Sequence, residues 1–169
     1  MQKQFLFHAS FVYGLNTSQE RKELWRNIHQ ISRMASAFPW VLLGDFNVVR
    51  HPEERRGGAT NWPTYMDDFN ECCYENSLDD LRHSRNMVTW SKAAGESFLA
   101  RKLDRVLVNN NWLAALPNAA AEFPTAGPSD HSPTIVRFGL VVHHRRPSFK
   151  FYNFWAEDSD FLEIVSRSW

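Results

Sequence analysis

Apolar positions divide the first part of the chain into a strand, an amphipathic helix and a second strand. Residues 5–13 (FLFHASFVY) are aromatic and apolar and end at a turn, which predicts a largely buried strand. Thr17 begins a capping box (TSQE), and apolar side chains then recur at steps of three and four up to Phe38. This spacing predicts a helix that ends at Pro39. The apolar run 40–43 (WVLL) predicts a strand buried on both faces.

The middle and later parts of the chain predict shorter elements. Residues 50–62 are polar and glycine-paired, which predicts a surface loop with solvated charges at residues 53–56. A helix is expected to open at Pro63, with Met66, Phe69 and Cys73 on its apolar side. Further strands are expected at 87–90, 97–100, 103–108 and 134–140, with a helical turn at 110–116. Strands alternating with two long helices indicate an α/β (α+β) layered fold.

The character of the chain changes near residue 142. Residues 1–141 are expected to form one partial domain. Residues 142–169 begin with a basic and aromatic stretch (HHRRPSFKFYNFW from His143), which is typical of a linker. A short amphipathic helix is expected at 157–169.

Composition excludes several classes of protein. The 169 residues carry 19 Lys+Arg and 19 Asp+Glu, so the net charge is zero. This balance disfavours binding of nucleic acid by bulk electrostatics but leaves room for a local cationic cleft. No targeting signal and no apolar run of membrane-spanning length is seen, so we expect an intracellular protein, nuclear or cytoplasmic, without a membrane partner. Cys72 and Cys73 are adjacent, which fits neither a disulfide nor a zinc site.

Candidate chemistry begins where the second strand ends. Gly44 is followed by Asp45, Phe46 and Asn47, and alternation along an extended chain directs Asp45 and Asn47 to one side and Phe46 into the core. A carboxylate and an amide at the carboxyl end of a strand occupy the edge at which open α/β sheets bind ligands. The alternative is a Gly-Asp turn with a capping Asn.

Three further positions are candidates. Asp130 and His131 precede the last strand, where adjacent Asp and His side chains can serve a metal and a general base; a simple turn is the alternative. Asp104 lies inside a β-branched strand, where a buried carboxylate needs a partner such as histidine. Tyr13 ends the first strand with Asn16 in the following turn, although a core aromatic is an equal alternative for Tyr13.

The order of these motifs resembles the endonuclease/exonuclease/phosphatase superfamily. The finer pattern is similar to the endonuclease domain of non-LTR long interspersed retrotransposons, especially those of plants. The matching stretches are FVYGLN, RKELW, PWVLLGDFNVV, VTWS, RKLDRVLVN, GPSDHSP and the linker-like FKFYNFW. The resemblance implies part of a DNase I-like four-layer α/β/β/α sandwich, with mixed or antiparallel sheets inside and helices outside.

The resemblance also implies roles for the candidate residues in the hydrolysis of a phosphodiester. Asp45 would position or activate the water or protonate the leaving oxygen, and Asn47 would donate to the phosphate. His131 would polarise the water or hold the phosphate, with Asp104 orienting it. Asp130 would lie by Mg²⁺ (or Mn²⁺). Tyr13 and Asn16 would contact the phosphate, and the partner would be the phosphate backbone of DNA.

One departure from the family pattern limits this hypothesis. No Gln-Glu-Thr-like segment with a metal-binding Glu is found in the sequence, so we expect the C-terminal half of such a domain, truncated at the N-terminus. Three functions stay open: an Mg²⁺-dependent DNA endonuclease of a retroelement, impaired by the missing Glu; a non-catalytic remnant or weak nucleic-acid-binding module; and a phosphatase of the same superfamily. Self-association through an exposed sheet face is also expected.

Overall fold

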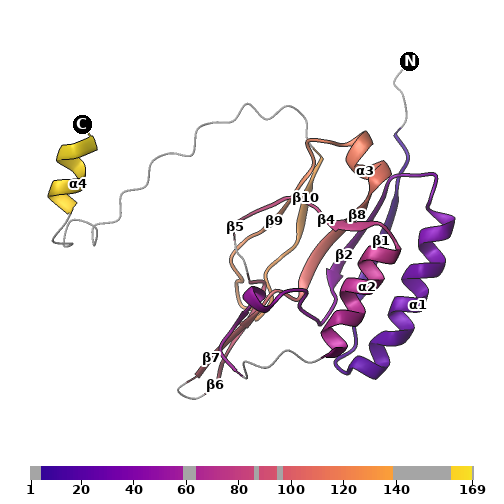
Figure 1. Ribbon diagram of the computed structural model, residues 1–169, viewed down its shortest axis with the longest axis horizontal. Helices are drawn as coiled ribbons and strands as arrows, with labels where there is room; N and C mark the ends of the chain where they lie inside the picture. Colours follow the sequence, from indigo (N-terminus) through magenta and orange to yellow (C-terminus); the bar gives the residue numbers. More distant parts are fainter. Residues whose placement is uncertain (1–4, 59–63, 86–87, 95–96, 139–160, 169) are drawn as a thin grey trace.

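The computed structural model describes residues 5–58, 64–85, 88–94, 97–138 and 161–168, which form three small sheets with helices (Figure 1). The helices are α1 (Ser18–Met34), α2 (Asp67–Glu75), α3 (Asn110–Ala115) and α4 (Phe161–Ser168), with 3-10 turns η1 (Pro52–Glu54) and η2 (Thr64–Met66). The strands are β1 (His8–Tyr13), β2 (Trp40–Asp45), β3 (Arg55–Arg56), β4 (Leu78–Asp80), β5 (His83–Arg85), β6 (Trp90–Ala94), β7 (Ser97–Arg101), β8 (Asp104–Asn109), β9 (Ala120–Phe123) and β10 (Ile135–Arg137).

The central sheet has the strand order β1-β2-β8-β4. Strand β1 pairs with β2 in parallel, whereas β8 pairs antiparallel with both β2 and β4. Gly44 allows the close approach of β1 and β2, because its φ is +136° and an added Cβ would lie 2.1 Å from the Val12 carbonyl oxygen. The sheet thus brings the carboxyl ends of β1 and β2 to the amino end of β8.

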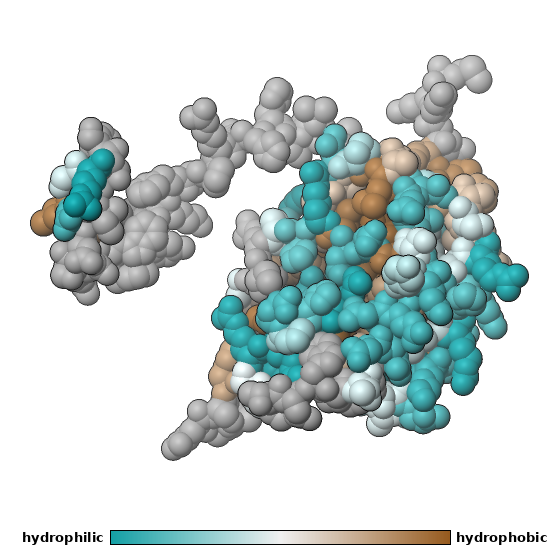
Figure 2. Space-filling view, viewed as in Figure 1, coloured by the Kyte–Doolittle hydropathy of each residue, from teal (hydrophilic) through white to brown (hydrophobic). Residues whose placement is uncertain are grey.

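Helices α1 and α2 cover one face of the central sheet (Figure 1). The core on that side contains Trp40, Phe46 and Phe69, and Phe69 stacks on Trp25 of α1 with ring centroids 4.9 Å apart. The capping box at Thr17 and Glu20 is confirmed, because the Glu20 N–H donates to Thr17 Oγ1 and the Thr17 N–H donates to Glu20 Oε2. Figure 2 shows that hydrophilic residues dominate the outer surface over these helices.

The second sheet, with the order β10-β9-β5, lies against the other face of the central sheet. Val106 and Val108 of β8 pack there with Ala121 and Phe123 of β9, and Trp112 of α3 is fully buried among them. A third sheet, β3-β7-β6, extends from the end of the molecule where β2 stops (Figure 1). The expected layered α+β fold with helices outside is confirmed.

The prediction that the first strand is largely buried is wrong. Strand β1 is the edge of the central sheet, and its side chains alternate between partly buried and exposed. Phe11 is 84% exposed and Tyr13 is 76% exposed, because the second sheet lies over β2 and β8 rather than over β1. An apolar face of β1 is therefore open in this chain.

The predicted surface loop at 50–62 is also wrong in part. It contains η1 and β3, and Glu54, expected to be solvated, is only 4% exposed. Residues 59–63, including Pro63, lie outside the described residues, and the helix expected to begin there starts as η2 at Thr64 and continues as α2.

Most other expected elements form with shifted bounds. The expected strands become β6, β7, β8 and β10, and the helical turn becomes α3, whereas β4, β5 and β9 were not predicted. The linker at 142–169 falls mostly outside the described residues, which include its helix α4. Both cysteines are free and buried. No described helix is long and apolar enough to cross a membrane.

Candidate active site

Three strand ends converge at one edge of the central sheet. The register pairs Tyr13 with Asp45 between β1 and β2, and Asp45 with Asp104 between β2 and β8. The Asp45 main-chain oxygen accepts from the Gly14 N–H at 2.6 Å, and the Leu103 oxygen accepts from the Phe46 N–H at 3.0 Å. These backbone bonds hold two carboxylates and a tyrosine in fixed proximity.

Asp104 and His131 form a hydrogen-bonded pair. The Asp104 Oδ2 atom lies 2.9 Å from the His131 Nδ1 atom, and the Asp104 side chain is 9% exposed. Thr89 supports both partners: its Oγ1 accepts from the Asp104 N–H at 2.8 Å, and its carbonyl oxygen accepts from the Ser132 N–H at 2.7 Å. The prediction that a histidine partners the buried Asp104 is confirmed. Because Nδ1 faces the carboxylate, Nε2 is the ring nitrogen left to meet a ligand.

The surroundings of the site raise the pKa values of His131 and Asp45. Burial lowers the pKa of His131, but the hydrogen bond and charge of Asp104, together with the charges of Asp45 and Asp130, outweigh burial and raise it above its ordinary value. Burial is the main cause that raises the pKa of Asp45, and the nearby Asp104 charge adds to it, against a hydrogen bond from Asn47. The arrangement thus favours an imidazolium beside a carboxylate that takes up protons more readily than usual.

A chain of hydrogen bonds joins Asp45 to the turn after β1. The Asp45 Oδ1 accepts from the Asn47 N–H at 2.7 Å, and the Asn47 amide donates to Asn16 Oδ1 at 2.8 Å. Arg21, which is 4% exposed, donates to the carbonyl oxygens of Leu15 and Asn16 at 2.9 and 2.8 Å. Asn47 has a φ of +52°, a left-handed conformation that Asn tolerates and that turns its amide toward this chain.

These residues surround a cavity of about 610 Å³. The candidates Tyr13, Asn16, Asp45, Asn47 and His131 all line it, and Asp104 lies directly behind His131. The remaining lining residues are Arg21, Val48, Val49, Met66, Trp90, Arg101 and Leu103. The structure therefore brings together every predicted catalytic and substrate-binding residue.

Asp130 is the exception among the candidates. Its Oδ2 accepts from the Trp90 indole N–H at 2.9 Å, and it lines a separate depression beside Thr89 and Phe98. The ligand atoms that lie within 4.8 Å of one another belong instead to Asp45, Asp104 and His131. The expectation that Asp130 holds a metal stays a prediction.

Sequence patterns missed three cationic or aromatic residues of the cavity. Arg21 falls at helical spacing from Leu24 and Ile28, on the apolar stripe of α1, and a charge on an apolar stripe is a signal for a buried arginine. Trp90 and Arg101 stand in register on β6 and β7. The Arg101 guanidinium donates to main-chain oxygens of Arg56, Ala100 and Gly57, which fixes it at the cavity wall.

Comparison with known proteins shows the fold. No protein-family model matches the sequence, and no curated protein matches it. Among solved structures, the endonuclease domain of TRAS1, a telomere-specific non-LTR retrotransposon, is similar with a TM-score of 0.54 and 14% identity over 72% of this chain and 53% of that chain. A beta toxin from Staphylococcus aureus is similar with a TM-score of 0.50 and 15% identity over 79% of this chain and 50% of that chain.

The chain therefore has a DNase I-like fold and spans about half the length of these two structures. The fold prediction made from the motif order is confirmed.

Proposed function

We propose that this chain hydrolyses phosphodiester bonds of DNA, as an endonuclease of the retroelement type that depends on a divalent cation. The observation that carries the proposal is the convergence of the Asp104–His131 pair, Asp45 and Asn47 on one cavity. The likeness to the TRAS1 endonuclease domain supports DNA as the substrate class.

Each side chain has a role that its chemistry suits. The oxygen of a water molecule attacks phosphorus while the bond from phosphorus to the leaving oxygen breaks. Asp45 positions the attacking water and accepts its proton, and a proton from the site or solvent reaches the leaving oxygen. Imidazolium His131 and the Asn47 amide donate to phosphate oxygens as negative charge develops on them. Tyr13 and Asn16 contact the flanking phosphate oxygens from the open side.

The donor set fits Mg²⁺ or Mn²⁺. Hard divalent cations favour carboxylate oxygens and commonly take only one or two from the protein, the rest coming from water and phosphate. Asp45 offers a carboxylate in the cavity, within 4.8 Å of the ligand atoms of Asp104 and His131. When bound, such a cation would neutralise charge on the phosphate in the transition state.

DNA binding rests on a local cationic wall rather than on net charge. Arg21 and Arg101 line the cavity, whereas the whole chain is neutral. Few phosphates are then neutralised, so DNA binding should be weak, and the logarithm of the binding constant should fall with only a small slope against the logarithm of the salt concentration.

A second candidate is a module that binds nucleic acid without cleaving it. Asp130 supports this alternative, because its carboxylate is engaged by Trp90 and not by the group that could hold a metal. An end-labelled DNA duplex separates the candidates: cleavage with Mg²⁺ that Asn47→Ala abolishes supports the endonuclease, whereas a gel shift without cleavage, unchanged by EDTA, supports the binding module. A phosphatase would instead release phosphate from p-nitrophenyl phosphate and leave the duplex intact.

A further inference from the structure

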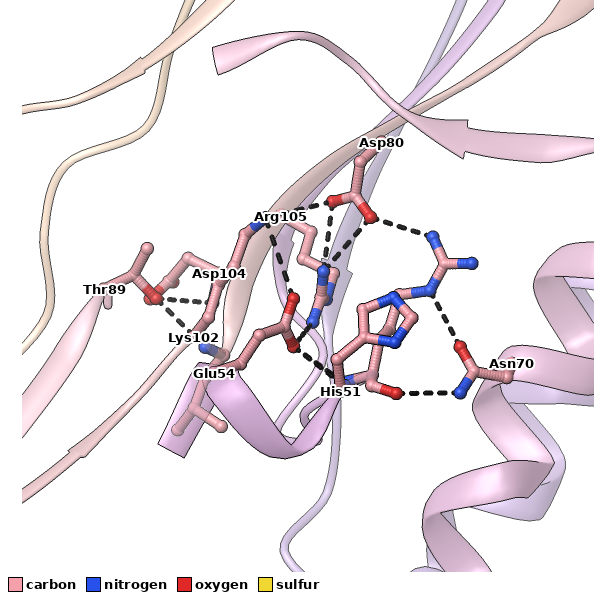
Figure 3. Close-up of polar contacts among 10 residues, drawn as sticks. His51, Glu54, Asn70, Asp80, Thr89, Lys102, Asp104 and Arg105 are labelled. Atoms are coloured by element: carbon pink, nitrogen blue, oxygen red, sulfur yellow. Dashed lines mark hydrogen bonds and ion pairs between the residues drawn. The ribbon is translucent and has the colours of Figure 1, made fainter. Parts of the chain in front are cut away.

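A buried cluster of charged side chains lies on the α2 side of β8, behind the cavity. We name it the ion cluster, and it contains Arg50, Glu54, Asp80, Lys102 and Arg105. Figure 3 shows Glu54 and Asp80 converging on the Arg105 guanidinium. The Arg105 side chain is fully buried, and those of Lys102 and Glu54 are 5% and 6% exposed. None of the five lines the cavity.

The ion cluster contributes less to stability than apolar side chains of the same volume would. Burying ions costs several kcal/mol each, and apolar replacements of buried ion pairs are often neutral or stabilising. Three cations meet two carboxylates here, so charge is not even balanced within the cluster. Its arrangement therefore points to a task other than stability.

Glu54 adds side-chain bonds between two segments that also meet at their ends, where the Phe46 N–H donates to the Leu103 oxygen and where Arg55 pairs with Arg101. Its Oε2 accepts from the N–H of Arg50 at 2.7 Å and of His51 at 3.4 Å, and it also pairs with Arg105. The Glu54 main-chain oxygen accepts from the Lys102 N–H at 3.1 Å. One residue thus fastens the segment after β2 to the residues that open β8.

The two fastened segments carry opposite walls of the site. The segment after β2 holds Asn47, and its next two residues, Val48 and Val49, line the cavity. The opening of β8 holds Asp104, the residue directly before Arg105. Arg105 points toward α2 and lies 5.6 Å from the Phe69 ring centre, whereas Asp104 points to His131. A shift of β8 against the other segment would change the spacing of Asn47 and His131.

We propose that Glu54 is a positioning residue that sets the distance between Asn47 and the Asp104–His131 pair. Its carboxylate does so by bonding both to the segment after β2 and to Arg105 of β8. The inference rests on the proposed function for its kinetic consequence, but the positioning itself has a readout that needs no turnover. Arg105 is the charged partner that holds the Glu54 carboxylate in place. Asn70 of α2 also holds the segment after β2, because its amide donates to the Arg50 carbonyl oxygen at 2.8 Å and accepts from Arg50 Nε at 3.0 Å.

The test compares Glu54→Gln with Glu53→Gln, a matched change at the exposed neighbour in η1. In the full chain, Glu54→Gln should lower kcat on the DNA duplex about 10- to 100-fold with KM changed less than about 2-fold, because misplaced groups lose transition-state contacts. The NMR signals of the Asn47 backbone N–H and the His131 ring should also move. Glu53→Gln should leave both readouts at wild-type values.

A double variant, Glu54→Met with Arg105→Met, separates positioning from folding. It removes both charges of the Glu54–Arg105 pair, so its thermal stability should equal or exceed that of Glu54→Gln. Met at position 54 leaves the N–H groups of Arg50 and His51 without their acceptor, so kcat should be low and the Asn47 NMR signal displaced. This variant also serves if Glu54→Gln does not fold.

Two results would overturn the inference while leaving the proposed function intact: a folded Glu54→Gln with wild-type kcat and unmoved Asn47 and His131 signals, or a double variant whose kcat returns to wild type. If the wild-type chain cleaves no DNA but the two signals move in Glu54→Gln alone, the positioning role is supported and the proposed function fails.

Discussion

Replacing Asp104 by Asn removes the charge behind His131 with almost no change of shape. The hydrogen bond between them spans 2.9 Å, and hydrogen bonds to charged groups contribute about 1.5–3 kcal/mol. The His131 side chain is 32% exposed, so water screens the pair and the low end of that range applies. The hydrogen bond and the charge of Asp104 are the largest causes that raise the pKa of His131, so Asp104→Asn should lower that pKa.

The consequence for activity follows from the sign of this shift. If His131 acts as an imidazolium, the cleavage rate falls as the pH rises through its pKa, which Asp104 raises. In Asp104→Asn the fall should therefore occur at a lower pH, and the rate near neutral pH should drop about 10- to 100-fold, part of it from lost orientation of the ring.

Two assays check this prediction independently. An NMR titration of the His131 ring gives its pKa without any need for turnover, and single-turnover cleavage of a labelled duplex gives the pH profile. Asp79→Asn, at an exposed carboxylate on β4 that stands opposite Val108 rather than Asp104, is the matched control and should change neither. A His131 pKa equal to that of wild type in Asp104→Asn, or an unmoved pH profile, would refute the reasoning.

Five further predictions concern single positions. Phe69→Ala should lower the free energy of unfolding by about 3–5 kcal/mol in chemical denaturation, because the fully buried ring contacts the central core; a loss below about 1 kcal/mol would contradict this. Burial raises the pKa of Asp80, but the charges of Arg105, Lys102 and Arg50 outweigh burial and hold that pKa at about 2. The stabilising contribution of Asp80 should therefore be complete above about pH 4 and be lost as the pH falls toward 2. Acid unfolding of Asp80→Asn should lack this pH-dependent loss of stability. Asn47→Gly should keep the thermal stability, since Gly accepts the +52° φ, yet reduce cleavage about 100-fold; equal cleavage would remove Asn47 from the site. Phe11→Ser should shift sedimentation toward monomer, because this ring is 84% exposed on the open face of β1; an unchanged profile would show that the face does not self-associate. Asp130→Asn keeps an acceptor for the Trp90 indole N–H but removes the charge. If Asp130 binds the metal, this substitution should raise the Mg²⁺ concentration for half-maximal cleavage about 10-fold; an unchanged Mg²⁺ requirement would show that Asp130 only holds Trp90.

Local patterns were sufficient where neighbours in sequence decide the structure. Thr17 and Glu20 cap α1, and the apolar run from Trp40 forms β2 with Phe46 in the core. Asp45 ends β2 and Asn47 follows it closely, whereas His131 reaches them through an isolated bridge to Trp90 and its bond to Asp104.

Long-range partners account for what the patterns missed. Glu54 belongs to a run of four charged residues that locally favours solvation, and its burial depends on Arg105, 51 positions away. The strands β4, β5 and β9 have three or four residues each, too short for an alternating pattern to stand out, and pairing partners stabilise them. Strand β1 has the composition of a buried strand, but burial depends on what covers it, which its own residues do not encode.

Relaxation of supercoiled plasmid DNA tests the central claim most directly. The full chain should convert supercoiled plasmid to the nicked form with Mg²⁺, and the conversion should disappear both with EDTA and in His131→Ala, because His131 and the Asp45 carboxylate that could hold the metal line one cavity. A folded wild-type chain that leaves the plasmid supercoiled, or nicking that persists in His131→Ala, would contradict the assignment of this cavity as a phosphodiesterase site.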